Sequence, residues 1–111
     1  EYTEAMTVID VNTGKFDGNG KDREKTFFKI NSEAVVEIAR QLKLRNISGI
    51  IIVDFINMTN EENRNEMLAL LKAELAKDSV STVFVDFTRL GLAEITRKKI
   101  KRPLYEILCE Q

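Results

Sequence analysis

Two aspartates close apolar, strand-like segments, and they are the residues of this sequence best placed to do chemistry. Asp10 ends the run "MTVID", and Asp54 ends the run "GIIIVD". Burying an unpaired carboxylate costs several kcal/mol, so a charge beside a buried strand usually has a partner, a metal ion or a function.

A carboxylate pair of this kind could hold a divalent cation. Two carboxylates a few ångströms apart repel each other, and a bound cation keeps both ionised. Oxygen-only ligands favour Mg²⁺, with Mn²⁺ as the alternative. The 111 residues contain no histidine, which excludes His-ligated metals, histidine acid–base catalysis and Ser-His-Asp triads within this segment. The competing interpretation is that Asp10 and Asp54 are ordinary strand-end residues that cap the loops after them.

Strand-like and helix-like segments alternate along the chain. Residues 14–25 are rich in glycine and charge and predict a mobile loop or loose hairpin. Asn31 can cap the first helix, and Thr59–Glu62 form a capping box for the second. We expect strands over 4–12, 48–56, 82–87 and 92–99, helices over 31–44 and 60–77, and a short terminal helix over 102–108.

This alternation predicts an α/β fold, a mixed and mostly parallel sheet with two main helices packed on it. Ligands gather at the carboxyl ends of the strands in such sheets, so Asp10 and Asp54 should lie at the same edge. The unbroken apolar run Ile50–Val53 is typical of a strand that is covered on both faces.

Composition indicates one small domain over residues 1–111, with 43% hydrophobic residues to build a core. No apolar run approaches the ~20 residues that span a bilayer, so no membrane association is expected. The single cysteine, Cys109, excludes an internal disulfide or a multi-cysteine zinc site and favours a reducing, cytoplasmic setting. The chain begins with Glu-Tyr rather than Met, and we expect it to be a fragment of a longer protein.

Three stretches together resemble the ribonuclease E/G family: "IDVNTGKF", "KINSEAVVEIARQLKLRNISGIIIVDFINM" and "LGLAEITRKK". Their order and spacing match from about Ala5 to Lys101. This part of the family is its DNase I-like subdomain, which carries the catalytic metal site.

The resemblance implies a Mg²⁺-dependent endoribonuclease. It implies that Asp10 and Asp54 hold the metal and that Asn12 supports the site, although Asn12 could also be a simple turn residue. The family cleaves single-stranded RNA with a metal-activated water, leaving 5′-phosphate and 3′-hydroxyl ends. It also implies a homo-oligomer whose subunits are tied by zinc, bound only by residues beyond Gln111.

The end of the chain is basic although the net charge is −1. Residues 88–104 hold six basic residues against one acid. A cluster of this kind is either a solvated face or a contact for RNA phosphates. The candidate RNA-binding residues are Arg97, Lys98, Lys99, Lys101 and Arg102.

Two departures and two rival functions remain open. Asn57 stands where the family usually has an acid, and Ser79–Ser81 stand where it often has basic residues. A phospho-receiver domain is a rival of similar length, but its first strand ends on paired acids, whereas Asp10 is followed by Val11. The other rival is a non-catalytic interaction module that kept the fold and lost the reaction.

Overall fold

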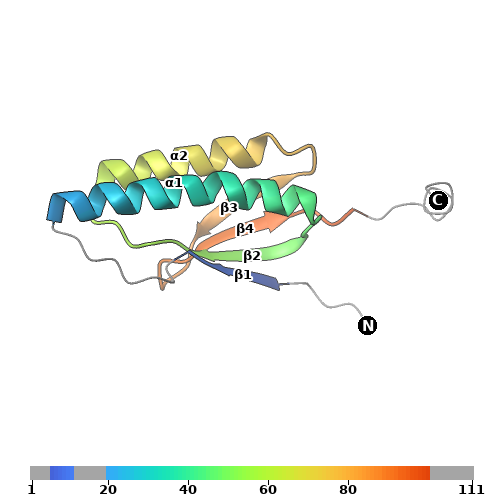
Figure 1. Ribbon diagram of the computed structural model, residues 1–111. Helices are drawn as coiled ribbons and strands as arrows, with labels where there is room; N and C mark the ends of the chain where they lie inside the picture. The colour runs from blue at the N-terminus through green and yellow to red at the C-terminus, as the bar shows by residue number, and fades with distance from the viewer. Residues whose placement is uncertain (1–5, 12–19, 101–111) are drawn as a thin grey trace, which may run out of the picture.

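One sheet and two helices form two layers. The computed structural model describes residues 6–11 and 20–100, and both helices lie on the same face of the sheet (Figure 1). Along the chain the elements are β1 (Met6–Asp10), α1 (Gly20–Leu44), β2 (Gly49–Asp54), α2 (Glu61–Ala76), β3 (Thr82–Phe87) and β4 (Ala93–Arg97). The predicted α/β class is confirmed, and the predicted terminal helix over 102–108 lies outside the described residues.

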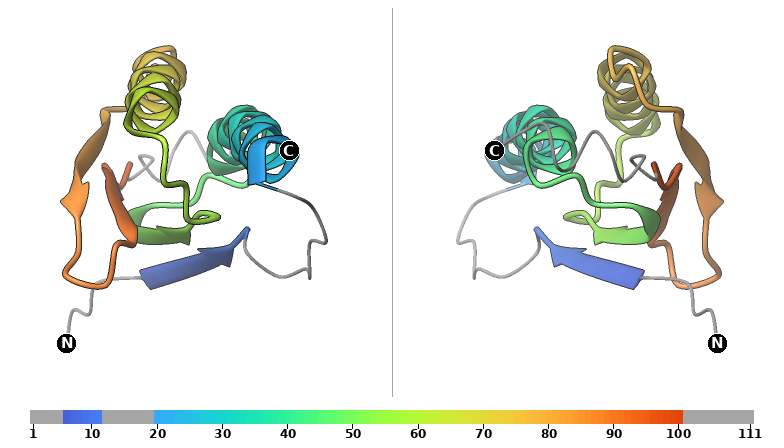
Figure 2. Two further views of the ribbon diagram at one scale, coloured as in Figure 1. Left: turned by 90° about the vertical axis from the view of Figure 1, so that its left-hand side faces the viewer. Right: turned by 90° about the vertical axis from the view of Figure 1, so that its right-hand side faces the viewer.

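The strands form one mixed sheet in the order β1-β2-β4-β3. β1 and β2 are parallel, whereas β4 is antiparallel to both β2 and β3. Three strands, β1, β2 and β3, thus share one direction, but β3 is not next to β2, because β4 lies between them. The short connection over 88–92 joins β3 and β4 as a hairpin, and β4 takes the central place because its Ala93 and Ile95 are fully buried. The sheet curls so that β3 stands beside α2 (Figure 2).

The strand β2 is covered on one face only within the described residues. Ile51 and Val53 have no exposed surface, whereas Ile50 and Ile52, which point to the other face, are half-buried. The prediction that both faces are covered is therefore wrong for this part of the chain. No described helix lies on the second face of the sheet.

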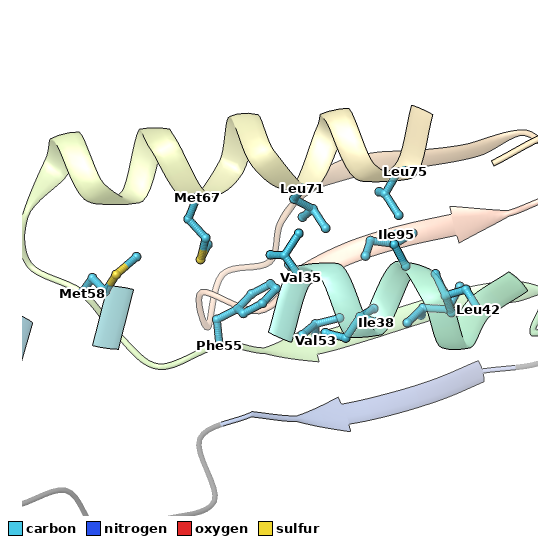
Figure 3. Packing of buried hydrophobic residues seen from close by; sticks show 13 residues of the cluster. Val35, Ile38, Leu42, Val53, Phe55, Met58, Met67, Leu71, Leu75 and Ile95 are labelled. Atoms are coloured by element: carbon cyan, nitrogen blue, oxygen red, sulfur yellow. The ribbon is translucent and has the colours of Figure 1, made fainter. Parts of the chain in front are cut away.

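The core lies between the helices and the covered face. Val35, Ile38 and Leu42 recur at helical spacing on α1 and meet the inward residues of β2 and β4. Figure 3 shows these side chains converging with those of α2. The inward face of α2 is formed by the buried Met67, Leu71 and Leu75 and by the partly buried Leu68.

The helix α1 begins at Gly20, well before the predicted start at Asn31. The prediction of a loop over 14–25 is therefore wrong from residue 20 onward, while residues 12–19 lie outside the described residues. Asn31 is no cap, because it sits in the middle of the helix and is fully buried. The helix α2 begins at Glu61, close to the predicted start, but the predicted Thr59–Glu62 capping box is wrong. The N-cap is Asn60, whose side-chain oxygen accepts a hydrogen bond from the Asn63 backbone N–H. In the described part of the chain, neither helix is long and apolar enough to cross a membrane.

Candidate functional site

Asp10 and Asp54 are in register across the parallel pair β1–β2. Neighbouring strands lie about 4.8 Å apart, so the two side chains leave the backbone at about that separation. The Val11 backbone N–H donates to the Asp54 carbonyl at 2.9 Å, which continues the pairing past the strand ends. The expectation that both aspartates lie at one edge of the sheet, on neighbouring strands, is confirmed.

Both carboxylates point away from the helices. Ile9 and Val53, the residues just before them, pack in or against the core, and side chains alternate between the faces of a strand. Asp10 is exposed and Asp54 is half-buried. Among the described residues no helix crosses in front of the pair, so a long polymer can approach it from this side (Figure 1).

The segment that follows Asp54 is tied to α1 at two points. The buried Asn31 amide donates from Nδ2 to the Ile56 carbonyl at 2.8 Å and accepts from the Ile56 N–H at Oδ1, at 3.0 Å. Further along, Glu24 accepts hydrogen bonds from the Thr59 hydroxyl at 2.8 Å and the Thr59 N–H at 3.2 Å. These bonds, the hydroxyl's first, lower the pKa of Glu24. The backbone beyond Asp54 is therefore held in one position.

Arg97 is buried and hydrogen-bonded within the protein. The prediction that it contacts RNA is therefore corrected. Its side chain is 3% exposed, and its Nε lies 2.7 Å from Oδ2 of Asp78, which is 5% exposed. Its Nη1 donates to the Asn46 side-chain oxygen at 3.0 Å and to the Ile47 carbonyl at 3.1 Å. The hydrogen bond from Arg97 holds the pKa of Asp78 at about 2, below its ordinary 3.8. Arg97 thus joins β4 to the ends of both helices.

Lys98 and Lys99, the other described residues of the basic run, lie away from the carboxylates. Arg97 pairs with Gly49, at the opposite end of β2 from Asp54, and strand geometry puts about 17 Å between those ends. Lys98 and Lys99 follow Arg97 and are exposed. Lys101 and Arg102, like Asn12, lie outside the described residues.

The carboxylate oxygens of Asp10 and Asp54 suit a metal ion that needs few protein ligands. Among residues 6–11 and 20–100, no group of three or more acidic, cysteine or histidine side chains gathers closely enough to hold a metal. Mg²⁺ usually binds one or two carboxylates and keeps several waters, whereas a structural zinc site needs four protein ligands. The pair Asp10 and Asp54 suits the first of these chemistries and not the second.

A cavity of about 280 Å³ opens on the helix side of the same edge, and the sequence interpretation missed it. One wall begins at Phe55, the residue after Asp54. Arg64 and Asn65 of α2 and Phe87 at the end of β3 line it too. Helical spacing offered a signal, because Arg64 stands one turn before the inward-facing Met67 and Leu68. The sequence could not identify Phe87 as a residue of the cavity, because the order of the strands decides what the end of β3 faces.

The chain is similar to a known family over most of its length. The model of the Ribonuclease E/G family matches residues 1–100. Ribonuclease G of Haemophilus influenzae is 49% identical over 111 residues, which are 100% of this chain and 22% of that protein. Ribonuclease G of Escherichia coli is 47% identical, with the same coverage. Ribonuclease E of Synechocystis sp. is 47% identical over 107 residues, 96% of this chain and 16% of that protein. The chain spans about a fifth of the length of these curated relatives.

Proposed function

The chain belongs to the Ribonuclease E/G family, and we propose that it supplies the metal-binding carboxylates of an endoribonuclease that cleaves single-stranded RNA. The observation that carries the proposal is the in-register pairing of Asp10 and Asp54 on the open face of the sheet. Because the chain is about a fifth of its relatives' length, the activity is proposed for the intact protein that contains it. Family membership argues against the phospho-receiver alternative.

Asp10 and Asp54 would hold one Mg²⁺ or Mn²⁺ ion between them. When bound, the cation would supply Lewis-acid stabilisation of the negative charge that develops on the phosphate under attack. Asp10 and Asp54 would be the protein ligands, with water completing the coordination. The predicted support from Asn12 belongs to the same proposal.

The scaffold's part is to fix the two carboxylates before RNA arrives. The β1–β2 pairing sets their separation, and the Asn31 clamp on Ile56 fixes the backbone beyond Asp54. Placing reacting groups in advance removes an entropic cost that would otherwise fall on the transition state. The open face leaves room for a nucleic acid strand to pass over the pair.

The test is cleavage of an end-labelled single-stranded RNA by the intact protein. We expect cleavage to require Mg²⁺ or Mn²⁺, to stop with a chelator, and to give 5′-phosphate and 3′-hydroxyl ends by mass spectrometry. Asp54→Asn should abolish most of the activity. Asp86→Asn is the matched control, since Asp86 is exposed on β3 and the variant keeps the oxygen that accepts from the Phe87 N–H. Equal cleavage by Asp54→Asn and the wild type would overturn the proposal and favour the non-catalytic module.

A further inference from the structure

The cavity beside Asp54 has an apolar floor and a polar rim. Its volume is about 280 Å³, just below the range of roughly 300–1,000 Å³ for small-molecule sites. Such a space suits one flat heterocycle better than a drug-sized ligand. The floor is made of Phe55, Ile56, Met58, Met67 and Leu68, and Figure 3 shows Phe55, Met58 and Met67 between α2 and β2.

Three polar side chains stand around this floor: Asn57, Arg64 and Asn65. All three are exposed, and in the part of the chain that the structure describes neither amide has a side-chain hydrogen bond. Among the described residues the Arg64 guanidinium makes one hydrogen bond, a long one of 3.4 Å from Nη1 to the Met58 carbonyl, and its charge helps to lower the pKa of Glu24. Amides present a donor and an acceptor together, which is the pattern that reads the edge of a nucleobase.

Phe87 provides a flat surface at the mouth of the cavity. The residue is 41% exposed, which is high for a phenylalanine at the end of a strand that packs beside a helix. Its ring meets that of Phe84 edge-on, with centroids 5.2 Å apart and an interplanar angle of 66°. One face of a ring supported in this way can accept a stacked base.

The wall of the cavity is held before any ligand binds. Ile56 and Met58 belong to the segment that α1 fixes through Asn31 and Glu24. A rigid wall reduces the ordering cost of binding. An apolar peptide segment would also cover the floor, but it would leave the rim's amides and guanidinium without partners, at a cost in free energy.

We propose that this cavity binds one unpaired base of the RNA strand, where the strand passes round the edge of the sheet from the phosphate at Asp10 and Asp54 to the helix side. The base would stack on Phe87 and offer its edge to Asn57 and Asn65, with Arg64 beside the strand. The inference rests on the proposed function, because the ligand is taken to be RNA. It adds a site that selects unpaired nucleotides, since a base inside a duplex cannot enter a pocket.

The experiment scans a single abasic nucleotide along a short single-stranded RNA and measures its affinity for the intact protein. A chelator is present, so no RNA is cut. For the wild type, an abasic nucleotide at one position near the cleavage point should weaken binding roughly 5- to 150-fold, the range for one stacked base. Phe87→Leu should lose this position dependence, whereas Phe87→Tyr should keep it. Leu90→Ala, in the exposed β3–β4 connection, is the control and should behave as wild type.

Two outcomes would overturn the inference. One is an identical abasic profile for the wild type and Phe87→Leu. The other is a wild-type profile in which no abasic position near the cleavage point weakens binding. Should Phe87→Leu fail to fold, Asn65→Ala on the exposed side of α2 gives the same comparison. Failure here is distinct from failure of the ribonuclease proposal, because that proposal is read from cleavage by Asp54→Asn and not from base dependence.

Discussion

The buried amide of Asn31 closes two hydrogen bonds on the backbone of Ile56, two residues beyond Asp54. The two residues are 25 positions apart in the sequence, so the contact fastens α1 to the exit of β2. A single side chain thereby satisfies both backbone polar groups of the buried residue Ile56. It also sets the direction in which the chain leaves the carboxylate pair.

Replacing Asn31 by Ala should lower the free energy of unfolding by about 2–4 kcal/mol. The Ile56 N–H and carbonyl would each lose a partner, and an unsatisfied buried group costs about 1–3 kcal/mol. Urea denaturation of the intact protein measures the change. Ser32→Ala is the matched control, because the Ser32 hydroxyl is buried and has no hydrogen-bond partner in the described chain. Ser32→Ala should be neutral or slightly stabilising. An equal loss of unfolding free energy in both variants would contradict a stabilising role for the Asn31–Ile56 hydrogen bonds.

The position of Asn31 also shows what the sequence could not predict. Asn31 precedes Ser-Glu-Ala and a series of apolar residues at helical spacing, a pattern that predicts an N-cap. The charged segment before Asn31 predicts a loop. Here tertiary packing overrides that local signal, because the amide has a partner on a strand exit that is distant in sequence. Arg97 carried a better signal. It shares a strand face with Ala93 and Ile95, so period-two alternation already indicated burial.

The closeness of Asp10 and Asp54 was predictable because it depends on only two strands. Strand-ending acids and the parallel β1–β2 crossover place Asp10 and Asp54 together whatever the rest of the sheet does. The order of β3 and β4 was not predictable, since it depends on which hairpin strand buries more surface against β2. Features that depend on that order, such as the exposure of Phe87, were therefore out of reach.

Stability should fall in acid because of the pair Asp78 and Arg97. The folded pKa of Asp78 is about 2, below its ordinary 3.8, so the bond contributes fully above about pH 4 and is lost as the pH falls toward 2. That shift corresponds to up to about 2 kcal/mol. Urea denaturation from pH 6 to pH 2 measures it. Asp78→Asn should flatten this part of the profile, and an unchanged slope would contradict the assignment.

Arg97→Met should cost about 3–5 kcal/mol, because it leaves the buried carboxylate of Asp78 without its cation. Thermal or urea unfolding of the intact protein gives the value. Lys98→Met is the control on the adjacent, exposed residue and should change stability by less than about 0.5 kcal/mol. Similar losses of stability in the two variants would mean that the ion pair of Arg97 with Asp78 does not stabilise the fold.

Lys98 and Lys99 are the described residues left to test the RNA-binding prediction for the basic run. If both contact phosphates, replacing both by Ala should reduce the slope of log affinity against log salt by about 1.4 units, at about 0.7 per phosphate of a single strand. RNA affinity measured across a salt series gives the slope. Lys43→Ala, in the last turn of α1, is a basic control. An unchanged slope would assign Lys98 and Lys99 to a solvated surface.

Melting temperature should report the shared cation without any RNA. Two like charges at this spacing repel by roughly 1 kcal/mol when water screens them, so Asp54→Asn should hold or slightly raise stability in the absence of metal. Added Mg²⁺ should raise the melting temperature of the wild type and of Asp86→Asn, because a ligand that binds only the folded state stabilises it. It should not raise that of Asp10→Asn or Asp54→Asn. Equal Mg²⁺ shifts in all four proteins would place the cation elsewhere.

The most direct test of the account is whether Asp10 and Asp54 act as one catalytic unit. Single-turnover cleavage of saturating single-stranded RNA would be compared for Asp10→Asn, Asp54→Asn and the double variant of the intact protein, with Mg²⁺ present. Each single change should remove about 4 kcal/mol of transition-state stabilisation, about a thousandfold in rate, while RNA affinity stays nearly unchanged. The double variant should be little slower than either single one, because residues that act together are not additive. Cleavage by either single variant within about tenfold of the wild type, or a double variant with the product of both losses, would contradict a shared catalytic metal.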